Sequence, residues 1–127
     1  MFKVGDRVWW TKYKILCEVA DIKYSENGTP FEWIIDTPGF KGIRFDLFRI
    51  KEITQTADSM FEELGYEKRD KVYGKRNASW YETIEFYNNY YTHTEWHEDE
   101  EETRAVPTTI EEHLAIHQKL IELGWIE

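Results

Sequence analysis

The sequence has a single cysteine, Cys17, among its 127 residues. One thiol cannot form an intrachain disulfide and cannot supply a Cys-rich zinc site, so the sequence excludes both as supports for the fold. Cys17 lies in the mostly apolar stretch Ile15–Val19, a setting typical of a small buried hydrophobic side chain.

Long hydrophobic runs are absent as well. No apolar run approaches the roughly 20 residues that a membrane-spanning helix needs. Charges interrupt the segment Met1–Asp6, which is therefore not typical of a signal peptide. We expect a cytoplasmic protein that has no membrane partner.

The common catalytic motifs are missing too. The sequence has no nucleophile elbow, no phosphate-binding glycine loop and no paired catalytic carboxylates in a defined context. This pattern predicts a protein that is not an enzyme and carries no cofactor.

Positive charge is scarce in the second half of the chain. Residues 1–52 carry nine Lys or Arg and eight Asp or Glu, a net charge of +1. Residues 53–127 carry seven Lys or Arg and seventeen Asp or Glu, a net charge of −10. Direct nucleic-acid binding by this acidic part is disfavoured because phosphate contacts need cations, whereas attraction to a basic protein surface is favoured.

The first 52 residues read as a series of short strands. The alternation of apolar and polar residues slips near Ala20–Asp21, which predicts a β-bulge, and Asn27–Gly28 predicts a tight hairpin turn. The strands are expected over residues 7–11, 15–24, 31–36 and 43–50. Such spacing is typical of a small barrel or sandwich.

This part of the chain resembles an SH3-like barrel of the Tudor/KOW type in three features. They are Val4–Trp10, the bulged strand with its Asn-Gly hairpin, and Ile43–Ile50. The resemblance implies a module over residues 1–52 that binds peptide, protein or nucleic acid through its loops. Its aromatic side chains predict either a core or a cage for a cation or a proline-rich peptide. The rings are Trp9, Trp10, Tyr13, Trp33 and Phe40, of which Trp9, Tyr13 and Trp33 are the candidate partner-binding residues.

Residues 56–127 read as an α-β-β-β-α module with an antiparallel sheet, so the whole chain is expected to be α+β. Thr56 can cap a helix that ends at Gly65, residues 53–55 form the junction, and a capping-box pattern beginning at Thr108 starts a last helix that runs to Gly124. Strands are expected over residues 66–73, 80–87 and 90–96, followed by a polar loop over residues 97–104.

This module resembles small uncharacterised proteins of phages and prophages of Gram-positive bacteria. The resemblance lies in Thr56–Tyr66, Ile84–Tyr87, Thr109–Ile116 and Glu122–Trp125, in the same order. It implies an accessory phage protein with no catalytic residues to carry over.

Two clusters in this module are candidate sites. His113 and His117 are spaced to share the apolar face of the last helix, either as structural histidines or as a metal pair completed by His93 or His97. The acidic run is either a solvated loop or an extended array of charges that mimics phosphates and occupies a groove lined with Lys and Arg. Its five members are Glu98, Asp99, Glu100, Glu101 and Glu102.

Charge and resemblance together predict a non-enzymatic phage accessory protein. It is expected to bind and inhibit a host protein with a basic surface, such as a nuclease of a defence system, in the manner of an anti-CRISPR protein. The alternatives are an SH3-like adaptor that binds nucleic acid or peptide, and a metal-binding protein that uses its histidines.

Overall fold

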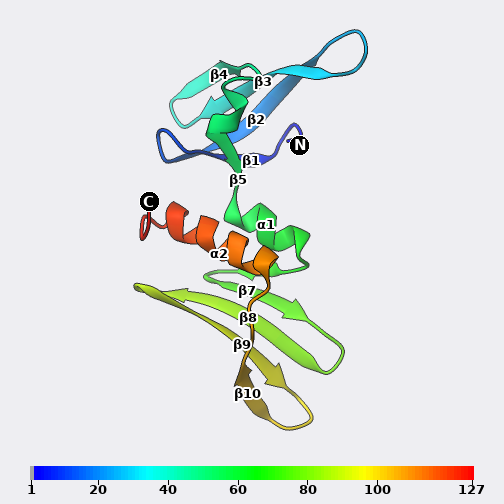
Figure 1. Ribbon diagram of the computed structural model, residues 1–127, viewed down its shortest axis with the longest axis vertical. Helices are drawn as coiled ribbons and strands as arrows, with labels where there is room; N and C mark the ends of the chain where they lie inside the picture. Colours follow the sequence, from blue (N-terminus) through cyan, green and yellow to red (C-terminus); the bar gives the residue numbers. More distant parts are fainter. Residues whose placement is uncertain (1) are drawn as a thin grey trace. The chain divides into compact units, whose positions relative to one another are not determined.

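A computed structural model of the protein describes residues 2–127 and divides the chain into two compact units, Met1–Thr56 and Ala57–Glu127. Each unit contains one antiparallel sheet and a hydrophobic core of its own (Figure 1). The predicted α+β class is confirmed, because two helices accompany the second sheet. No helix in the described part of the chain is long and apolar enough to cross a membrane.

The N-terminal unit is a five-stranded sheet with strand order β4-β3-β2-β1-β5. Its strands are β1 (Arg7–Trp10), β2 (Ile15–Tyr24), β3 (Pro30–Thr37), β4 (Phe40–Phe45) and β5 (Ile53–Gln55), and a short 3-10 helix, η1 (Ile50–Glu52), precedes β5. The predicted bulge is confirmed, since the register between β2 and β3 shifts between Val19 and Asp21. The Asn-Gly hairpin is confirmed too: Gly28 has a φ of 83°, which glycine adopts without strain.

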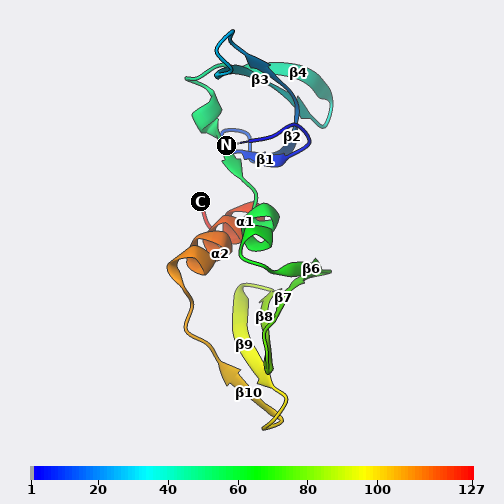
Figure 2. The same cartoon turned by 90° about the vertical axis from the view of Figure 1, so that its right-hand side faces the viewer.

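The sheet of this unit curves strongly (Figure 2) but is open. Within residues 2–127, β4 and β5 do not pair, so a closed SH3-like barrel is not confirmed. The three residues of β5 pair with β1 alone, through Val8–Trp10, so β5 is one edge of the sheet and β4 is the other. Residues 53–55 were expected to be a junction, and instead they form this edge strand.

The core of the N-terminal unit is built from the alternate residues that its strands turn to one face. Its buried members are Val8, Trp10, Cys17, Val19, Ile22, Trp33, Ile35, Phe45 and Ile53. Cys17 is buried here as expected, and this burial raises the pKa of its thiol.

The C-terminal unit is an antiparallel meander with strand order β10-β9-β8-β7-β6. Its elements are α1 (Ala57–Glu63), β6 (Glu67–Arg69), β7 (Val72–Arg76), β8 (Trp80–Tyr87), β9 (Tyr90–His97), β10 (Glu102–Ala105) and α2 (Ile110–Glu122). The two helices lie beside each other near one end of the sheet, and the β9–β10 hairpin forms the other end (Figure 1).

Two strands differ from the expectation. The single strand predicted over residues 66–73 is broken into β6 and β7 by a turn in which Asp70 has a φ of 56°. Strand β10 lies in the segment predicted to be a loop, and all four of its residues are exposed.

The core of the C-terminal unit joins both helices to the sheet. Its buried members are Ala57, Phe61, Tyr66, Tyr73, Ile84, Phe86, Ala115 and Ile116. Phe61 of α1 stacks on Tyr73 of β7 with their ring centroids 4.1 Å apart. Helix α2 begins with the predicted type of capping box, one residue later than expected, between Thr109 and Glu112.

Candidate functional sites

The acidic run forms a turn rather than an extended array. His97, the last residue of β9, pairs with Glu102, the first residue of β10, and Glu101 has a φ of 49°. The five carboxylates, Glu98 to Glu102, are therefore gathered at the end of one hairpin, which we call the acidic tip. The prediction of alternating charges along an extended chain is wrong, because the backbone reverses within the run.

Two arginines neutralise part of the acidic tip. Arg76 contacts Glu98, with 2.5 Å between the guanidinium nitrogen and the carboxylate oxygen, and Arg104 pairs with Glu100 and Glu102. Across residues 2–127, no ion pair involves the remaining two acidic residues, Asp99 and Glu101. All five side chains of the tip are exposed, so the tip presents a net charge of about −3 to solvent.

The candidate aromatic residues do not form one open cage. Trp33 is 0% exposed and belongs to the core, so its assignment as a partner-binding residue is wrong. Trp9 is 8% exposed, whereas Tyr13 is 55% exposed and Phe40 is also on the surface. Of the three rings predicted to bind a partner, only Tyr13 lies on the surface.

A different aromatic group contacts a cation that the chain itself supplies. The ring centroid of Trp10 lies 4.5 Å from that of Tyr13 and 5.0 Å from that of Phe45, both edge-on. The guanidinium of Arg49 lies over the Phe45 ring, 4.5 Å from its centroid. Glu52 accepts hydrogen bonds from Trp10 and Arg49, which lower the pKa of its carboxyl. Arg49 therefore makes cation–π contacts within the chain, with Phe45 and, at 5.7 Å, with Trp10.

The predicted histidine pair is on the surface. His113 and His117 share one face of α2, with ring centroids 6.4 Å apart, but this face is exposed. The residues that α2 buries are Glu112, Ala115, Ile116 and Gln118. The expectation that the histidines point to the apolar core is wrong, because α2 has apolar residues on more than one side and its buried side includes Glu112.

His93 and His97 have partners elsewhere. His97 contacts Glu95 across 2.5 Å and stacks on Trp80. His93 is buried and hydrogen-bonds through Nδ1 to the hydroxyl of Thr108, 3.1 Å away. None of these contacts joins His93 or His97 to the surface pair His113 and His117.

Sequence reasoning missed a buried polar cluster inside the C-terminal unit. We call Tyr66, Glu82, His93 and Glu112 the buried cluster. The Tyr66 hydroxyl contacts Oε2 of both Glu82 (2.5 Å) and Glu112. Nε2 of His93 lies 3.0 Å from Oε2 of Glu82 and 3.8 Å from Oε2 of Glu112.

Four different segments supply these side chains. Tyr66 follows α1, Glu82 lies on β8, His93 lies on β9, and Glu112 is in the first turn of α2. The side chains of Glu82, His93 and Glu112 are 12%, 4% and 8% exposed. One signal for the cluster was present in the sequence. Glu82 has the same place in the strand alternation as Ile84 and Phe86, so it lies on the face of β8 that enters the core.

The environment fixes the protonation of two members of the cluster. Burial, together with hydrogen bonds to the two carboxylates, raises the pKa of Tyr66 far above its usual value, so the phenol keeps its proton. Burial alone raises the pKa of Glu112, but hydrogen bonds from Tyr66 and from the Thr109 backbone outweigh it and hold that pKa below its usual range. The cluster therefore holds negative charge where little water reaches it.

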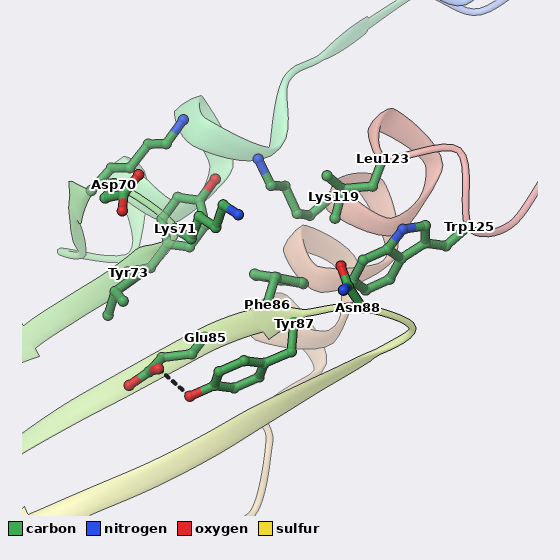
Figure 3. A pocket seen from close by; sticks show the side chains of 12 residues that line it. Asp70, Lys71, Tyr73, Glu85, Phe86, Tyr87, Asn88, Lys119, Leu123 and Trp125 are labelled. Atoms are coloured by element: carbon green, nitrogen blue, oxygen red, sulfur yellow. Dashed lines mark hydrogen bonds between the residues drawn. The ribbon is translucent and has the colours of Figure 1, made fainter.

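A groove of about 530 Å³ lies between the C-terminal end of α2 and the β7–β8 part of the sheet (Figure 3). Lys68, Lys71 and Lys119 line it together with apolar residues such as Leu123 and Trp125. Burial and the nearby charge of Lys68 lower the pKa of Lys119. Acidic side chains line the groove too, so its electrostatic character is mixed.

The fold and these sites define an α+β protein with two antiparallel sheets, an exposed acidic tip and a buried His-carboxylate cluster. Comparison with protein-family models, curated proteins and solved structures finds no match for this chain.

Proposed function

We propose that the protein is a non-enzymatic inhibitor that binds the basic, nucleic-acid-binding surface of a partner through its acidic tip. The observation that supports this proposal is the gathering of five exposed carboxylates in a single turn, Glu98 to Glu102. A patch with a net charge of about −3 attracts a groove lined with Lys and Arg and competes there with phosphates.

The resemblance of residues 56–127 to phage proteins narrows the proposed partner. An accessory phage protein of this kind meets host defence nucleases in the host cytoplasm, and these enzymes hold nucleic acid in basic grooves. An anti-CRISPR-like inhibitor is the concrete form of the proposal. Arg76 and Arg104 hold Glu98, Glu100 and Glu102 by ion pairs, which reduces the entropy that the tip loses on binding.

The test is to capture the partner from bacterial lysate with the wild-type protein and to identify it by mass spectrometry. A first variant replaces the five residues 98–102 by Ser. The control variant replaces five other exposed acidic residues of the same unit by Ser, so that both variants change the net charge by five. The control residues are Glu62, Glu63, Glu67, Glu111 and Glu127.

We expect the tip variant to lose the partner and the control variant to keep it. Raising the salt concentration should weaken the wild-type complex, because exposed charges are screened beyond about 8–10 Å at 0.1–0.15 M salt. Binding should also release nucleic acid from the partner. Equal partner capture by the tip variant and the wild type, at low and high salt, would show that the tip does not carry the function.

The N-terminal unit supports a second candidate, an SH3-like adaptor. Its sheet follows the order β4-β3-β2-β1-β5 and has a 3-10 turn before its last strand, and Tyr13 is exposed beside Trp10. An exposed ring next to a loop is the feature by which such modules hold peptides. A gel shift of labelled DNA or RNA, or binding of a proline-rich peptide, that is lost in Tyr13→Ala supports this candidate over the inhibitor.

A further inference from the structure

The buried cluster has more close polar contacts than it has protons to fill them. The hydroxyl of Tyr66 carries one hydrogen but contacts a carboxylate oxygen of both Glu82 and Glu112. That hydrogen can be donated to one of the two carboxylates at a time. The other contact then brings together two oxygen atoms that both act as acceptors, which is repulsive unless a cation or a further proton lies between them.

The charge of the cluster leads to the same requirement. Glu82 and Glu112 contribute two negative charges when ionised, and their side chains are 12% and 8% exposed. Buried charges are costly unless they are paired. A metal binds the neutral form of a histidine ring, and with His93 in that form the two ionised carboxylates give the cluster a charge of −2, which a divalent cation brings to zero.

The spacing of the ligand atoms suits a small metal ion. Oε2 of Glu82, Nε2 of His93 and Oε2 of Glu112 come from the three residues whose ligand atoms all lie within 4.8 Å of one another. A tetrahedral zinc ion with bonds of about 2.0–2.2 Å has its ligand atoms about 3.4 Å apart. The two distances from His93 Nε2, 3.0 Å to Glu82 and 3.8 Å to Glu112, bracket that value.

The second side of the His93 ring is arranged as in metal sites. Its Nδ1 lies 3.1 Å from the hydroxyl oxygen of Thr108, to which it can donate. A histidine that donates its Nδ1 proton in this way leaves the Nε2 lone pair free for a metal. The backbone N–H of Thr109 likewise holds the other carboxylate oxygen of Glu112, 2.9 Å away, and so orients the Oε2 atom toward the cluster.

We propose that Glu82, His93 and Glu112 form a three-ligand zinc site in the interior of the C-terminal unit, with the Tyr66 hydroxyl as a hydrogen-bond donor to its carboxylate ligands. Carboxylate and imidazole ligands at this close spacing favour zinc over calcium or magnesium, which need six or more oxygen ligands or retain water. Because the ligands come from both sides of the unit, the metal ties α2 to β8 and β9 and stabilises the fold. The site is separate from the acidic tip and from the pair His113 and His117.

The test uses the full, untagged chain. The protein is dialysed against a chelator, supplied with Zn²⁺ at neutral pH and freed of excess metal, and its zinc content and melting temperature are then measured. We expect one zinc per chain. At a zinc concentration about 100 times the dissociation constant, we expect the melting temperature to rise by about 10 °C or more.

Glu82→Gln is the diagnostic variant. Its amide group keeps the shape of the side chain and donates a hydrogen to the Tyr66 oxygen or to Glu112, so it fills the contact without a metal. We expect this variant to remain folded when metal-free and to lose both the zinc and the zinc-dependent rise in melting temperature. Glu112→Gln gives the same readout at the opposite carboxylate.

The matched control is the double variant His113→Ala/His117→Ala, which removes the surface pair and should still bind one zinc. Loss of zinc in this control, with retention in Glu82→Gln, would overturn the proposal and move the site to the surface. Absence of zinc binding by the metal-free wild type also overturns it. Partner capture by Glu82→Gln tests the inhibitor function separately, because the acidic tip is unchanged in that variant.

Discussion

Truncation of one ring in the C-terminal core tests whether the two units unfold independently. Phe61 is 0% exposed, and its ring stacks on Tyr73 and meets Tyr66 and Phe86 edge-on, with centroids 5.6 and 6.4 Å away. Phe61→Ala removes all three ring contacts and leaves a cavity. The core of the N-terminal unit shares no residue with this one, so the change should act on one unit only.

The expected loss is large compared with the stability of the unit. Truncation of a buried phenylalanine to alanine costs about 3–5 kcal/mol. At about 0.05–0.15 kcal/mol per residue, residues 57–127 have a total stability of about 4–11 kcal/mol. A loss of about 4 kcal/mol corresponds to an increase of about 1,000-fold in the unfolded population.

Hydrogen exchange measured by mass spectrometry separates the two units. We expect amides of β7, β8 and α2 to exchange about 1,000-fold faster in Phe61→Ala, and amides of β1 to β3 to exchange at the wild-type rate. Phe45→Ala, which empties the N-terminal core instead, should give the reverse pattern. Faster exchange throughout the chain in either variant would refute the reasoning, because it would mean that the two units unfold as one.

Two further predictions concern single residues of the C-terminal unit. A methyl group built on Gly74 would lie 1.9 Å from the hydroxyl of Tyr81 and 2.7 Å from its Cζ. Gly74→Ala should therefore lower the free energy of unfolding, measured in urea, by about 1–3 kcal/mol. In a Tyr81→Ala background the same change should be neutral or stabilising. Burial raises the pKa of Asp58, but hydrogen bonds from Tyr73 and Lys68 outweigh it and hold that pKa below the usual 3.8. The stability that ionised Asp58 contributes is thus present above about pH 4 and is lost as the pH falls through its lowered pKa. The free energy of unfolding of Asp58→Asn should therefore depend less steeply on pH in that acidic range than that of the wild type. An unchanged slope would contradict this assignment.

Local sequence signals predicted the elements whose backbone geometry is set by neighbouring residues. The Asn27–Gly28 hairpin, the bulge between Val19 and Asp21, and the strands β8 and β9 follow from turn chemistry and alternation, and all are present. Strand β10 was missed because its exposed residues carry no alternation. The break at Asp70 was missed because aspartate adopts a positive φ only occasionally, so its presence is a weak turn signal.

The orientation of α2 shows why the candidate site was harder to predict than the fold. Ile110 and Leu114 are exposed on one side of this helix, and Ala115 and Ile116 are buried on another, so the apolar residues alone do not define the buried side. Two overlapping capping boxes, with Thr108 or Thr109 as the cap, are also compatible with the sequence.

Contacts from other segments decide between these possibilities. Glu112 accepts a hydrogen bond from the Tyr66 hydroxyl and lies close to His93 and Glu82. The sheet positions His93 and Glu82, and the turn after α1 positions Tyr66. A glutamate on the core side of a helix is costly by itself, so its position is explained by partners distant in sequence rather than by periodicity. Glu112→Leu tests the contribution of the polar contacts against that of apolar burial: it adds apolar area to the buried side of α2 but removes one of the two carboxylate partners of Tyr66 and the side-chain half of the capping box with Thr109. If the polar contacts orient the helix, this variant should lose stability and give faster exchange in α2; a gain in stability would mean that burial of apolar area is sufficient.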